Sequence, residues 1–378
     1  MVIKTIPPVK PYFPFKDIQQ IKDAVEKILK SGMLTLGDYV KKFEAEYAKI
    51  CRVHHAIATS SGTSALEMAL RAMKLKEGDE VLVPTNTFTA TVASVIFAGG
   101  KPRLTDINPE SLSIDAENVQ KHLTQKTKGI IAVHIGGLIC PEIKQIKEIC
   151  EDHNLFLIED AAHAHGSTIN GDPAGSLGDI GCFSFYPTKV MTTSEGGMIT
   201  TNKDDVAHII KIMRDQGKES ADSNIIIELG YNWRMNEISA AIGLAQLRRL
   251  NEIVAKRNQI AKLYEKGLSQ LSGIRPQKIP PNMVTNFYKY IAFLKPEIDR
   301  DRFKQKLREQ GVRCGGEVYW PPCHLQPIYQ RLLGTKQGDF PISEEVTKRM
   351  ICLPMFTQMT QEEVSYVLDK VRDVLQNI

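Results

Sequence analysis

The chain has 378 residues, enough for one large domain and a smaller one with a sizeable buried core. Hydrophobic residues make up 42% and charged residues 24%, which is typical of a globular protein and argues against a disordered chain. The net charge of +4 is too small to indicate a nucleic-acid or membrane partner, but it is compatible with an anionic small-molecule substrate.

The first half of the chain alternates short apolar runs with amphipathic runs. The apolar runs predict strands over His55–Ser60, Glu80–Pro84, Pro102–Asp106, Gly129–His134, Leu155–Asp160, Cys182–Phe185 and Gly197–Thr201. Helical spacing predicts helices over Ser64–Met73, Ala90–Phe97 and Glu142–Cys150. Strands separated by helices need crossover connections, so we predict an α/β fold whose mainly parallel, seven-stranded type of sheet is covered by helices on both faces.

Two long helices follow, and the second is expected to lead out of the large domain. They are predicted over Asn236–Leu250 and Glu252–Leu271. The proline-rich segment Pro276–Pro281 is typical of a boundary. The later elements are a strand over Tyr288–Phe293 and helices over Asp301–Gln310 and Gln361–Leu375. We therefore expect a large domain over residues 1–250, including the N-terminal segment, and a smaller α+β domain over residues 251–378.

Ligands of parallel sheets bind beyond the carboxyl ends of the strands. His134, Glu159 and Asp160 end two predicted strands, so we expect chemistry near them. A carboxylate such as Asp160 at this edge needs a partner, because burial would otherwise neutralise it. A pyridinium N–H is one such partner, and a protonated ring nitrogen makes the ring an electron sink. A capping or salt-bridged aspartate is the alternative.

The segment Ser60–Ser64 joins a predicted strand to a predicted helix and contains Gly62. Glycine lets the backbone approach an anion, and the free N–H groups of a helix start attract phosphate. A plain helix cap is the alternative. Lys189 follows a predicted strand and precedes the polar loop TTSEGG. A Schiff-base lysine needs a depressed pKa, which burial and a cationic ring can provide; a single lysine is otherwise more often a surface charge.

Several ordered motifs give a more specific indication. These are SSGTSAL, PTNTFTAT, IEDAAHAHG, GSLGDIGCFSFYPTK, SEGGMITT, LGYNWRMNEISAAIG and FPISEEVTKRMICLPMF. In this order they resemble the motifs of the DegT/DnrJ/StrS family of sugar aminotransferases, which depend on pyridoxal phosphate (PLP) and have the fold of aspartate aminotransferase (fold type I). The resemblance covers nearly the whole chain.

The resemblance implies the roles of individual residues. Lys189 and Asp160 match the catalytic pair, the Schiff-base lysine and the partner of the ring nitrogen. The other residues that match cofactor contacts are Gly62, Thr63, Ser64 and Ser184 at the phosphate, Phe88 on the ring face, His163 at the ring hydroxyl, and Asn232. From sequence alone, Phe88 is equally natural as a core aromatic residue.

In the family the residue at Asn232 crosses from the partner subunit, so the resemblance implies a homodimer with a shared active site. Arg234 can bind a substrate carboxylate or brace the interface. Tyr319 and His324 resemble the family's substrate-side segment, although His324 can also be a structural histidine. The sequence departs from the family in TTSEGG, where TTGEGG is common, and in HIGGLICPEI, where an aspartate more often follows the proline.

The implied reaction moves an amino group from L-glutamate to a keto-sugar, with a nucleotide-linked keto-deoxysugar as the expected acceptor, through PLP and its pyridoxamine form (PMP). A keto group at C3 or C4 fits equally, and a cyclitol or sugar phosphate is an alternative acceptor. A PLP/PMP-dependent sugar dehydratase is the nearest alternative function, but dehydratases of this family replace the lysine with histidine. A non-catalytic regulatory protein of the same fold would need neither Lys189 nor Asp160, and a nicotinamide enzyme would need GxGxxG after its first strand.

The seven cysteines are scattered and form no CxxC pair, which favours reduced thiols over a disulfide or zinc framework, and we expect no metal. The opening segment MVIKTIPPVKPYFPF is interrupted by prolines and is not typical of a signal peptide. No apolar run approaches the length of a membrane span. We therefore expect a cytoplasmic protein.

Overall fold

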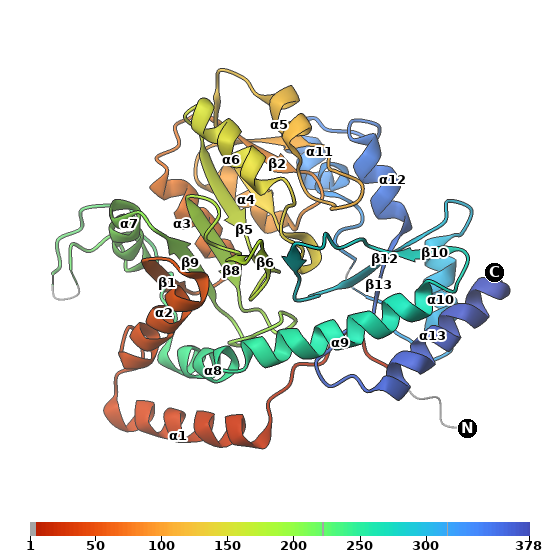
Figure 1. The fold of residues 1–378 in the computed structure, drawn as a ribbon. Coiled ribbons are helices and arrows are strands. Elements are labelled where there is room, and N and C mark those ends of the chain that lie inside the picture. The colour runs from red at the N-terminus through yellow and green to blue at the C-terminus, as the bar shows by residue number, and fades with distance from the viewer. Residues whose placement is uncertain (1–4, 221–222, 316) are drawn as a thin grey trace.

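The computed structural model describes residues 5–220, 223–315 and 317–378, and in these residues a seven-stranded sheet forms the centre (Figure 1). Across the sheet the strands are β1 (His55–Thr59), β9 (Gly197–Thr201), β8 (Ile180–Ser184), β5 (Phe156–Asp160), β4 (Thr127–Val133), β2 (Glu80–Pro84) and β3 (Lys101–Thr105). Neighbours run parallel, except that β9 pairs antiparallel with both β1 and β8. The seven apolar runs correctly predict these strands to within two residues at each end.

Alternate residues of each strand pack in two different cores, because successive side chains point to opposite faces. In β4, Ile130 and Ala132 belong to the first core, whereas Ile131 and Val133 belong to the second. Helices α2 (Asp38–Cys51), α6 (Ile143–Asp152) and α8 (Glu237–Leu247) contribute to the first core, and α3 (Gly62–Ala72), α4 (Thr89–Phe97) and α7 (Asp204–Arg214) to the second. Burial on both faces explains why the strands are almost continuously apolar.

A smaller antiparallel sheet forms the C-terminal domain. Its strands are β10 (Ile274–Pro276), β12 (Tyr290–Leu294) and β13 (Met350–Leu353). Three helices share a third core with them: α9 (Leu250–Leu268), α10 (Arg300–Glu309) and α13 (Gln361–Gln376). The fold is thus α/β with a mainly parallel central sheet and a smaller α+β domain, as predicted.

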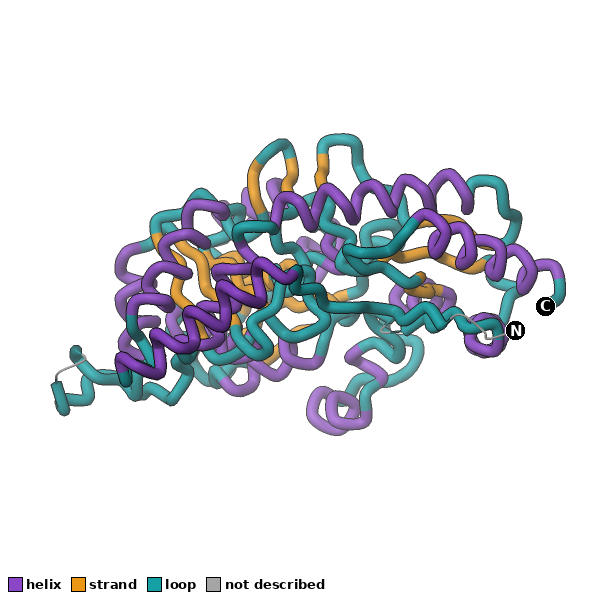
Figure 2. Tube along the Cα trace, turned by 90° about the horizontal axis from the view of Figure 1, so that it is seen from below, coloured by secondary structure: helices purple, strands orange, loops and turns teal. Residues whose placement is uncertain are grey.

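Helix α9 connects the two parts of the molecule. Its Val254 packs in the first core and its Tyr264 in the third. Because one helix is shared by the two parts, the boundary between the domains at residue 250 stays a prediction. The N-terminal segment runs along the molecule (Figure 2), and Ile6 forms a parallel bridge with Val312 in the smaller domain. Pro276, expected in a boundary segment, ends β10 and pairs with Ala292.

The remaining elements lie around these layers. They are α1 (Phe15–Ser31), α5 (Ala116–His122), α11 (Pro327–Leu333), α12 (Pro341–Arg349), a short sheet of β11 (Met283–Val284), β6 (Thr168–Ile169) and β7 (Asp172–Pro173), and 3-10 turns at Ile135–Gly137 and Cys323–Leu325. Across the described residues, no helix combines the length and apolar character that a membrane crossing needs.

Candidate active site

A cavity of about 420 Å³ opens at the carboxyl ends of β1, β5 and β8, where parallel sheets bind their ligands. It brings together residues that are far apart in the sequence. Seven of the nine residues expected to contact the cofactor line it: Gly62, Thr63, Phe88, Asp160, His163, Ser184 and Lys189. Ser64 and Asn232 do not.

The turn between β1 and α3 forms one wall of the cavity. Ser61 caps α3, because its hydroxyl accepts the Ser64 N–H at 3.0 Å, and the Ser64 hydroxyl accepts the Ser61 N–H in return. This reciprocal cap uses the hydrogen-bonding groups of Ser64. The backbone N–H groups of Gly62 and Thr63 stay available for an anion at the positive end of the helix dipole. A Cβ at Gly62 would lie 2.7 Å from the Cβ of Ser184, so only glycine allows this close approach.

Asp160 ends β5 and is buried, with 5% of its surface exposed. The Thr91 hydroxyl donates to one carboxylate oxygen at 2.7 Å, and the Ala162 N–H donates to the other at 3.2 Å. Burial raises the pKa of Asp160 above its ordinary value, although these hydrogen bonds and the charge of Lys189 partly oppose the rise. A desolvated carboxylate of this kind is well suited to a cationic N–H partner.

Lys189 lines the same cavity from the segment after β8. Its Nζ lies 4.7 Å from the centre of the Tyr288 ring. Desolvation by the surrounding protein lowers the pKa of Lys189, while Tyr288 and Asp160 act in the opposite direction. A depressed pKa makes the unprotonated amine, which is the nucleophilic and basic form, easier to reach at neutral pH.

His163 is buried and hydrogen-bonded through both ring nitrogens. Nδ1 accepts the Gly136 N–H at 3.3 Å, so the proton of the neutral ring is on Nε2, which lies 3.0 Å from the Tyr319 hydroxyl. Burial and the nearby positive charge of Lys189 lower the pKa of His163 well below its ordinary value. His163 is therefore a neutral hydrogen-bond donor on this side of the cavity.

Aromatic rings also line the cavity. Phe88 immediately precedes α4 and is 55% exposed, and its ring centre lies 5.7 Å from that of Tyr319. Tyr186 and Tyr288 also line the cavity. Such rings offer flat, apolar faces to a ring-shaped ligand.

Besides Ser64, three expected site residues lie outside the cavity lining. Asn232 is exposed, and Arg234 forms an ion pair with Asp215. His324 is fully buried, with Nδ1 2.7 Å from the Thr85 hydroxyl and Nε2 2.9 Å from a Glu344 oxygen. This network resembles that of a structural histidine. Substrate contacts by Arg234 and His324 stay predictions, as does the cofactor contact of Asn232.

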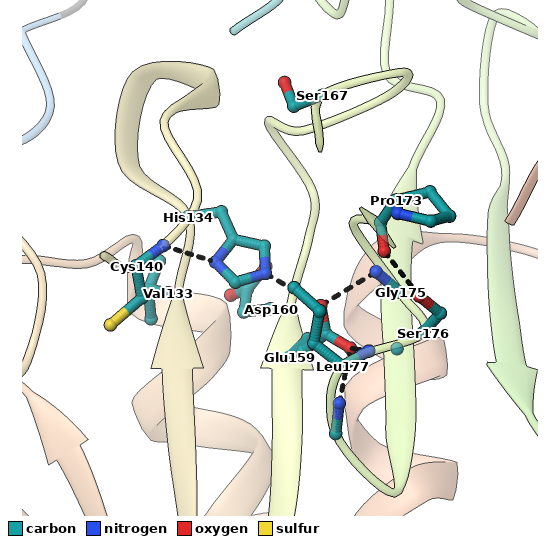
Figure 3. Close-up of polar contacts among 12 residues, drawn as sticks. Val133, His134, Cys140, Glu159, Asp160, Ser167, Pro173, Gly175, Ser176 and Leu177 are labelled. Atoms are coloured by element: carbon teal, nitrogen blue, oxygen red, sulfur yellow. Dashed lines mark hydrogen bonds and ion pairs between the residues drawn. The ribbon is translucent and has the colours of Figure 1, made fainter. Parts of the chain in front are cut away.

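The expectation that His134 and Glu159 join Asp160 at the ligand edge is wrong. Glu159 and Asp160 are consecutive in β5, so their side chains point to opposite faces. His134 donates from Nε2 to Glu159 at 2.9 Å, because its Nδ1 accepts the Cys140 N–H (Figure 3). The same carboxylate also accepts three backbone N–H groups, those of Gly175, Leu177 and Gly178 (Figure 3). Glu159 therefore holds the turn that contains Gly175, Leu177 and Gly178, and it does not line the cavity.

Sequence analysis did not single out several residues at the cavity or in contact with its charges. Among them are Thr91, which binds Asp160, and Tyr186, Tyr288 and Glu195, which line the cavity. For Thr91 a signal exists, because it lies within the quoted motif PTNTFTAT, although the motif does not mark its individual role. No motif marks Tyr288, which reaches the site through tertiary packing.

The cavity fits the cofactor that the resemblance implies. It combines a glycine turn at a helix start for an anion, a buried carboxylate for a ring nitrogen, and a partly buried amine for an aldehyde. Among the described residues, no group of three or more His, Cys, Asp or Glu side chains is arranged to hold a metal ion.

Comparisons with known proteins agree with this geometry. The model of the DegT/DnrJ/EryC1/StrS aminotransferase family matches residues 16–372. The chain is 38% identical to a GDP-perosamine synthase from Caulobacter vibrioides, over 90% of this chain and 91% of the relative. It is 32% identical to a UDP-N-acetyl-3-dehydro-alpha-D-glucosamine 3-aminotransferase from Acidithiobacillus ferrooxidans, over 96% and 95%. The crystal structure of DesV from S. venezuelae, in complex with a ketimine intermediate, superposes with a TM-score of 0.92 at 27% identity, covering 99% of this chain and 100% of DesV.

Proposed function

Because this chain belongs to the DegT/DnrJ/EryC1/StrS aminotransferase family, and its relatives include named sugar aminotransferases, we propose that it transfers the amino group of L-glutamate to a nucleotide-linked keto-deoxysugar. The observation that carries this proposal is that one cavity holds the Lys189 amine, the Asp160 carboxylate and the helix-start turn at Gly62. An amine, an acid and an anion site are the three contacts that PLP requires.

The chain's own residues would hold the cofactor as follows. The N–H groups of Gly62 and Thr63, with the Ser184 hydroxyl, bind the phosphate at the positive end of α3. Phe88 covers one face of the ring. His163 is neutral with its proton on Nε2, and this N–H would be shared between the Tyr319 hydroxyl and the ring hydroxyl. When bound, PLP supplies the electron sink that makes the donor's Cα proton removable.

Asp160 keeps the ring nitrogen protonated. The hydroxyl of Thr91 and the N–H of Ala162 hold its carboxylate in one orientation at the end of β5. Burial makes an unpaired charge at Asp160 unfavourable, so a cationic N–H is a strongly preferred partner.

Lys189 has two tasks. Its Nζ would hold the cofactor covalently at rest. After release, the amine would take the proton from the donor's Cα and deliver it to C4′ of the cofactor within the same half-reaction, and in the second half-reaction it would move a proton from C4′ to the sugar carbon. The lowered pKa of Lys189 favours the unprotonated form that both tasks need. Tyr319, which hydrogen-bonds His163 and faces Phe88, is placed to contact the sugar.

We further propose a homodimer with a shared active site. Among the described residues that line the cavity, Lys189 is the only cation, whereas the cofactor phosphate and the glutamate carboxylates are anionic. Next to Asn232, the segment 223–231 exposes five large apolar side chains: Ile225, Ile226, Ile227, Leu229 and Tyr231. An exposed apolar patch of this size favours contact with a second copy, which would bring Asn232 to the other cavity.

The seven cysteines are all free, which supports a reducing cytoplasmic location.

The proposed function is tested by a half-reaction. Protein purified with PLP is mixed with L-glutamate, and we expect its visible absorbance to fall while one equivalent of 2-oxoglutarate forms. L-Alanine and D-glutamate serve as donor controls. The amino-loaded protein is then offered a panel of GDP-, UDP- and dTDP-linked 3-keto and 4-keto sugars, with a keto-cyclitol and a keto-sugar phosphate for comparison, and products are identified by mass spectrometry.

The glutamate half-reaction tests amino transfer, and the acceptor panel tests the nature of the sugar. If glutamate changes neither the absorbance nor the 2-oxoglutarate level while PLP remains bound, the aminotransferase proposal is wrong, and loss of a sugar hydroxyl without nitrogen transfer would identify a dehydratase. If glutamate reacts but only the cyclitol or the sugar phosphate is aminated, the nucleotide-linked acceptor is wrong and the amino transfer stands.

A further inference from the structure

Tyr288 occupies a distinctive position between the two nitrogen-bearing side chains of the site. Its ring centre lies 4.7 Å from the Lys189 Nζ and 4.3 Å from the ring centre of His163. Its hydroxyl lies 3.0 Å from the Thr188 hydroxyl, in the residue that precedes Lys189. Tyr288 is 8% exposed, so packing holds the ring in this place.

The turn that carries Tyr288 is attached to the large domain. Asn286 is fully buried, and its Nδ2 donates to the carbonyl groups of His163 at 2.8 Å and His165 at 2.9 Å. Its Oδ1 accepts the Tyr288 N–H at 2.8 Å. The ring is therefore fixed relative to the segment that follows Asp160, although it belongs to a part of the chain more than a hundred residues later.

The same turn contains a strained residue, and a buried cation from α9 binds its carbonyl groups. Phe287 has φ 47°, in the left-handed region that a bulky side chain rarely adopts. Arg257 of α9, 4% exposed, donates to the carbonyl groups of Asn286, Phe287 and Tyr288 at 2.9, 2.6 and 3.1 Å. Strain that the surroundings hold in place is typical of functional sites. Here it presents one aromatic face to the cavity.

We propose that Tyr288 is a positioning residue, which holds the free amine of Lys189 over its aromatic face while that amine carries the transferred proton. A lysine side chain is flexible, and an ammonium group is attracted to the face of an aromatic ring. The ring therefore keeps the amine near the cofactor after the covalent bond to it opens. This inference rests on the proposed role of Lys189, and it adds a residue that the family motifs do not mark.

Other charged and titratable groups also act on the amine. Asp160 and Tyr288 favour the ammonium form, whereas Lys289 and desolvation disfavour it. His163, His165, Tyr186, Glu195 and Tyr319 surround the amine or line its cavity, and Lys10 and Arg257 line a small cavity on its other side. A change at Tyr288 must therefore be compared with a variant that leaves all of these groups in place.

The test measures the Lys189 amine directly in the full-length, cofactor-free protein. Lysines are labelled by trace acetic anhydride at a series of pH values, and acetylation of Lys189 is quantified by mass spectrometry. Leucine in Tyr288→Leu fills the space without an aromatic face, Tyr288→Phe keeps the face, and Tyr290→Phe is the matched control, because Tyr290 is a buried neighbour whose hydroxyl has no partner among the described residues.

Loss of the side chain removes the aromatic face together with the hydroxyl, which also favours the ammonium, whereas Asp160 stays in place. We expect Tyr288→Leu to shift the pH midpoint of Lys189 labelling downward by about one unit, Tyr288→Phe to shift it by less than half as much, and Tyr290→Phe to leave it in place. An unchanged or upward midpoint in a folded Tyr288→Leu protein overturns the proposal. No donor, acceptor or cofactor is present, so this result is independent of the glutamate test.

A second measurement needs no variant that risks misfolding. In wild-type protein carrying 13C-labelled lysine, the Lys189 Hε resonances should lie upfield of those of exposed lysines, because the Tyr288 ring current shields them. Tyr288→Phe should retain the upfield position, because it keeps the aromatic ring. The signal is assigned to Lys189 by its loss in Lys189→Arg and its retention in Tyr288→Phe. Lys189 resonances at the exposed-lysine position in the wild-type protein would also overturn the proposal.

Discussion

Burial acts in opposite directions on the charges of Asp160 and Lys189 in the cavity. It raises the pKa of Asp160 and lowers that of Lys189, because each loses the water that would stabilise its charge. Each also favours the charged form of the other. A ring that carries a protonated nitrogen at one end and an aldehyde at the other would satisfy both groups at once.

Asp160→Asn tests this arrangement at the residue scale. The amide retains the shape and can still accept the Thr91 hydrogen bond, but it no longer stabilises a positive ring nitrogen. We expect the glutamate half-reaction to slow by about 100- to 1,000-fold, the usual effect of removing one preorganised electrostatic contact, and we expect Thr91→Val, which keeps the charge, to cost far less. Stopped-flow absorbance measures both, and a rate for Asp160→Asn within threefold of wild type would contradict the assigned role.

Two buried histidines predict how stability depends on pH. Burial lowers the pKa of His165 to about 3 and that of His163 well below its ordinary value. The unfolded chain therefore binds protons at these residues below about pH 6.5 while the folded chain does not, so the free energy of unfolding falls as the pH falls. Between about pH 6.5 and 5 we expect a loss of about 2 kcal/mol for each histidine.

Urea unfolding at pH 7 and pH 5 measures this loss. His165→Gln should reduce it by about 2 kcal/mol, whereas the exposed His208 can be replaced by asparagine without changing it. Equal unfolding free energies of the wild-type protein at the two pH values would show that these histidines are not kept neutral.

Single residues of the site differ in how far the sequence predicts them. Asp160 stands at a strand end and Lys189 in the segment after a strand, both within ordered motifs, so position and chemistry together single them out. Ser64 has the right motif, but its side chain is used in the cap of α3. Tyr288 could not be found, because its contact with Lys189 depends on a turn that Arg257 and Asn286 hold against a distant segment.

At the scale of elements, the turn after Lys189 contains one residue in an unfavourable conformation. Ser194 has φ 73°, where the related motif commonly has glycine. The left-handed region costs an L-residue about 1–2 kcal/mol, and glycine escapes this cost but loses more backbone entropy on folding. We expect Ser194→Gly to raise the free energy of unfolding by up to about 1 kcal/mol and Ser194→Ala to leave it unchanged or lower it. Urea unfolding measures both, and a marked loss in Ser194→Gly would contradict this explanation.

The strands of the large sheet are predictable because burial on both faces makes them continuous apolar runs. The strands of the smaller sheet are harder to predict from the sequence. The three-residue strand β10 has little pattern of its own and forms only by pairing with β12. The residue-level alternation that separates Glu159 from Asp160 was visible in the sequence, but the backbone turn that Glu159 anchors was not.

At the scale of the whole molecule, the exposed segment 223–231 predicts association. Five large apolar side chains there would cost solubility in a monomer. We expect the wild-type protein to be dimeric by analytical ultracentrifugation. Ile226→Asp with Leu229→Asp should shift it toward monomer and weaken PLP binding, because Asn232 would no longer reach a second cavity.

A surface control separates this effect from general loss of solubility. Ile328 and Leu332 of α11 are also exposed. A variant with Ile328→Asp and Leu332→Asp should remain dimeric. A wild-type protein that sediments as a monomer with full PLP occupancy would contradict the shared site.

The whole interpretation depends on Lys189 holding the cofactor. Borohydride reduction of the PLP-loaded protein, followed by peptide mapping, should place the reduced pyridoxyl group on Lys189 and on no other lysine, with Asp160→Asn labelled at the same residue. A pyridoxyl group on a different lysine, or no fixed cofactor in a protein that binds PLP, would contradict it.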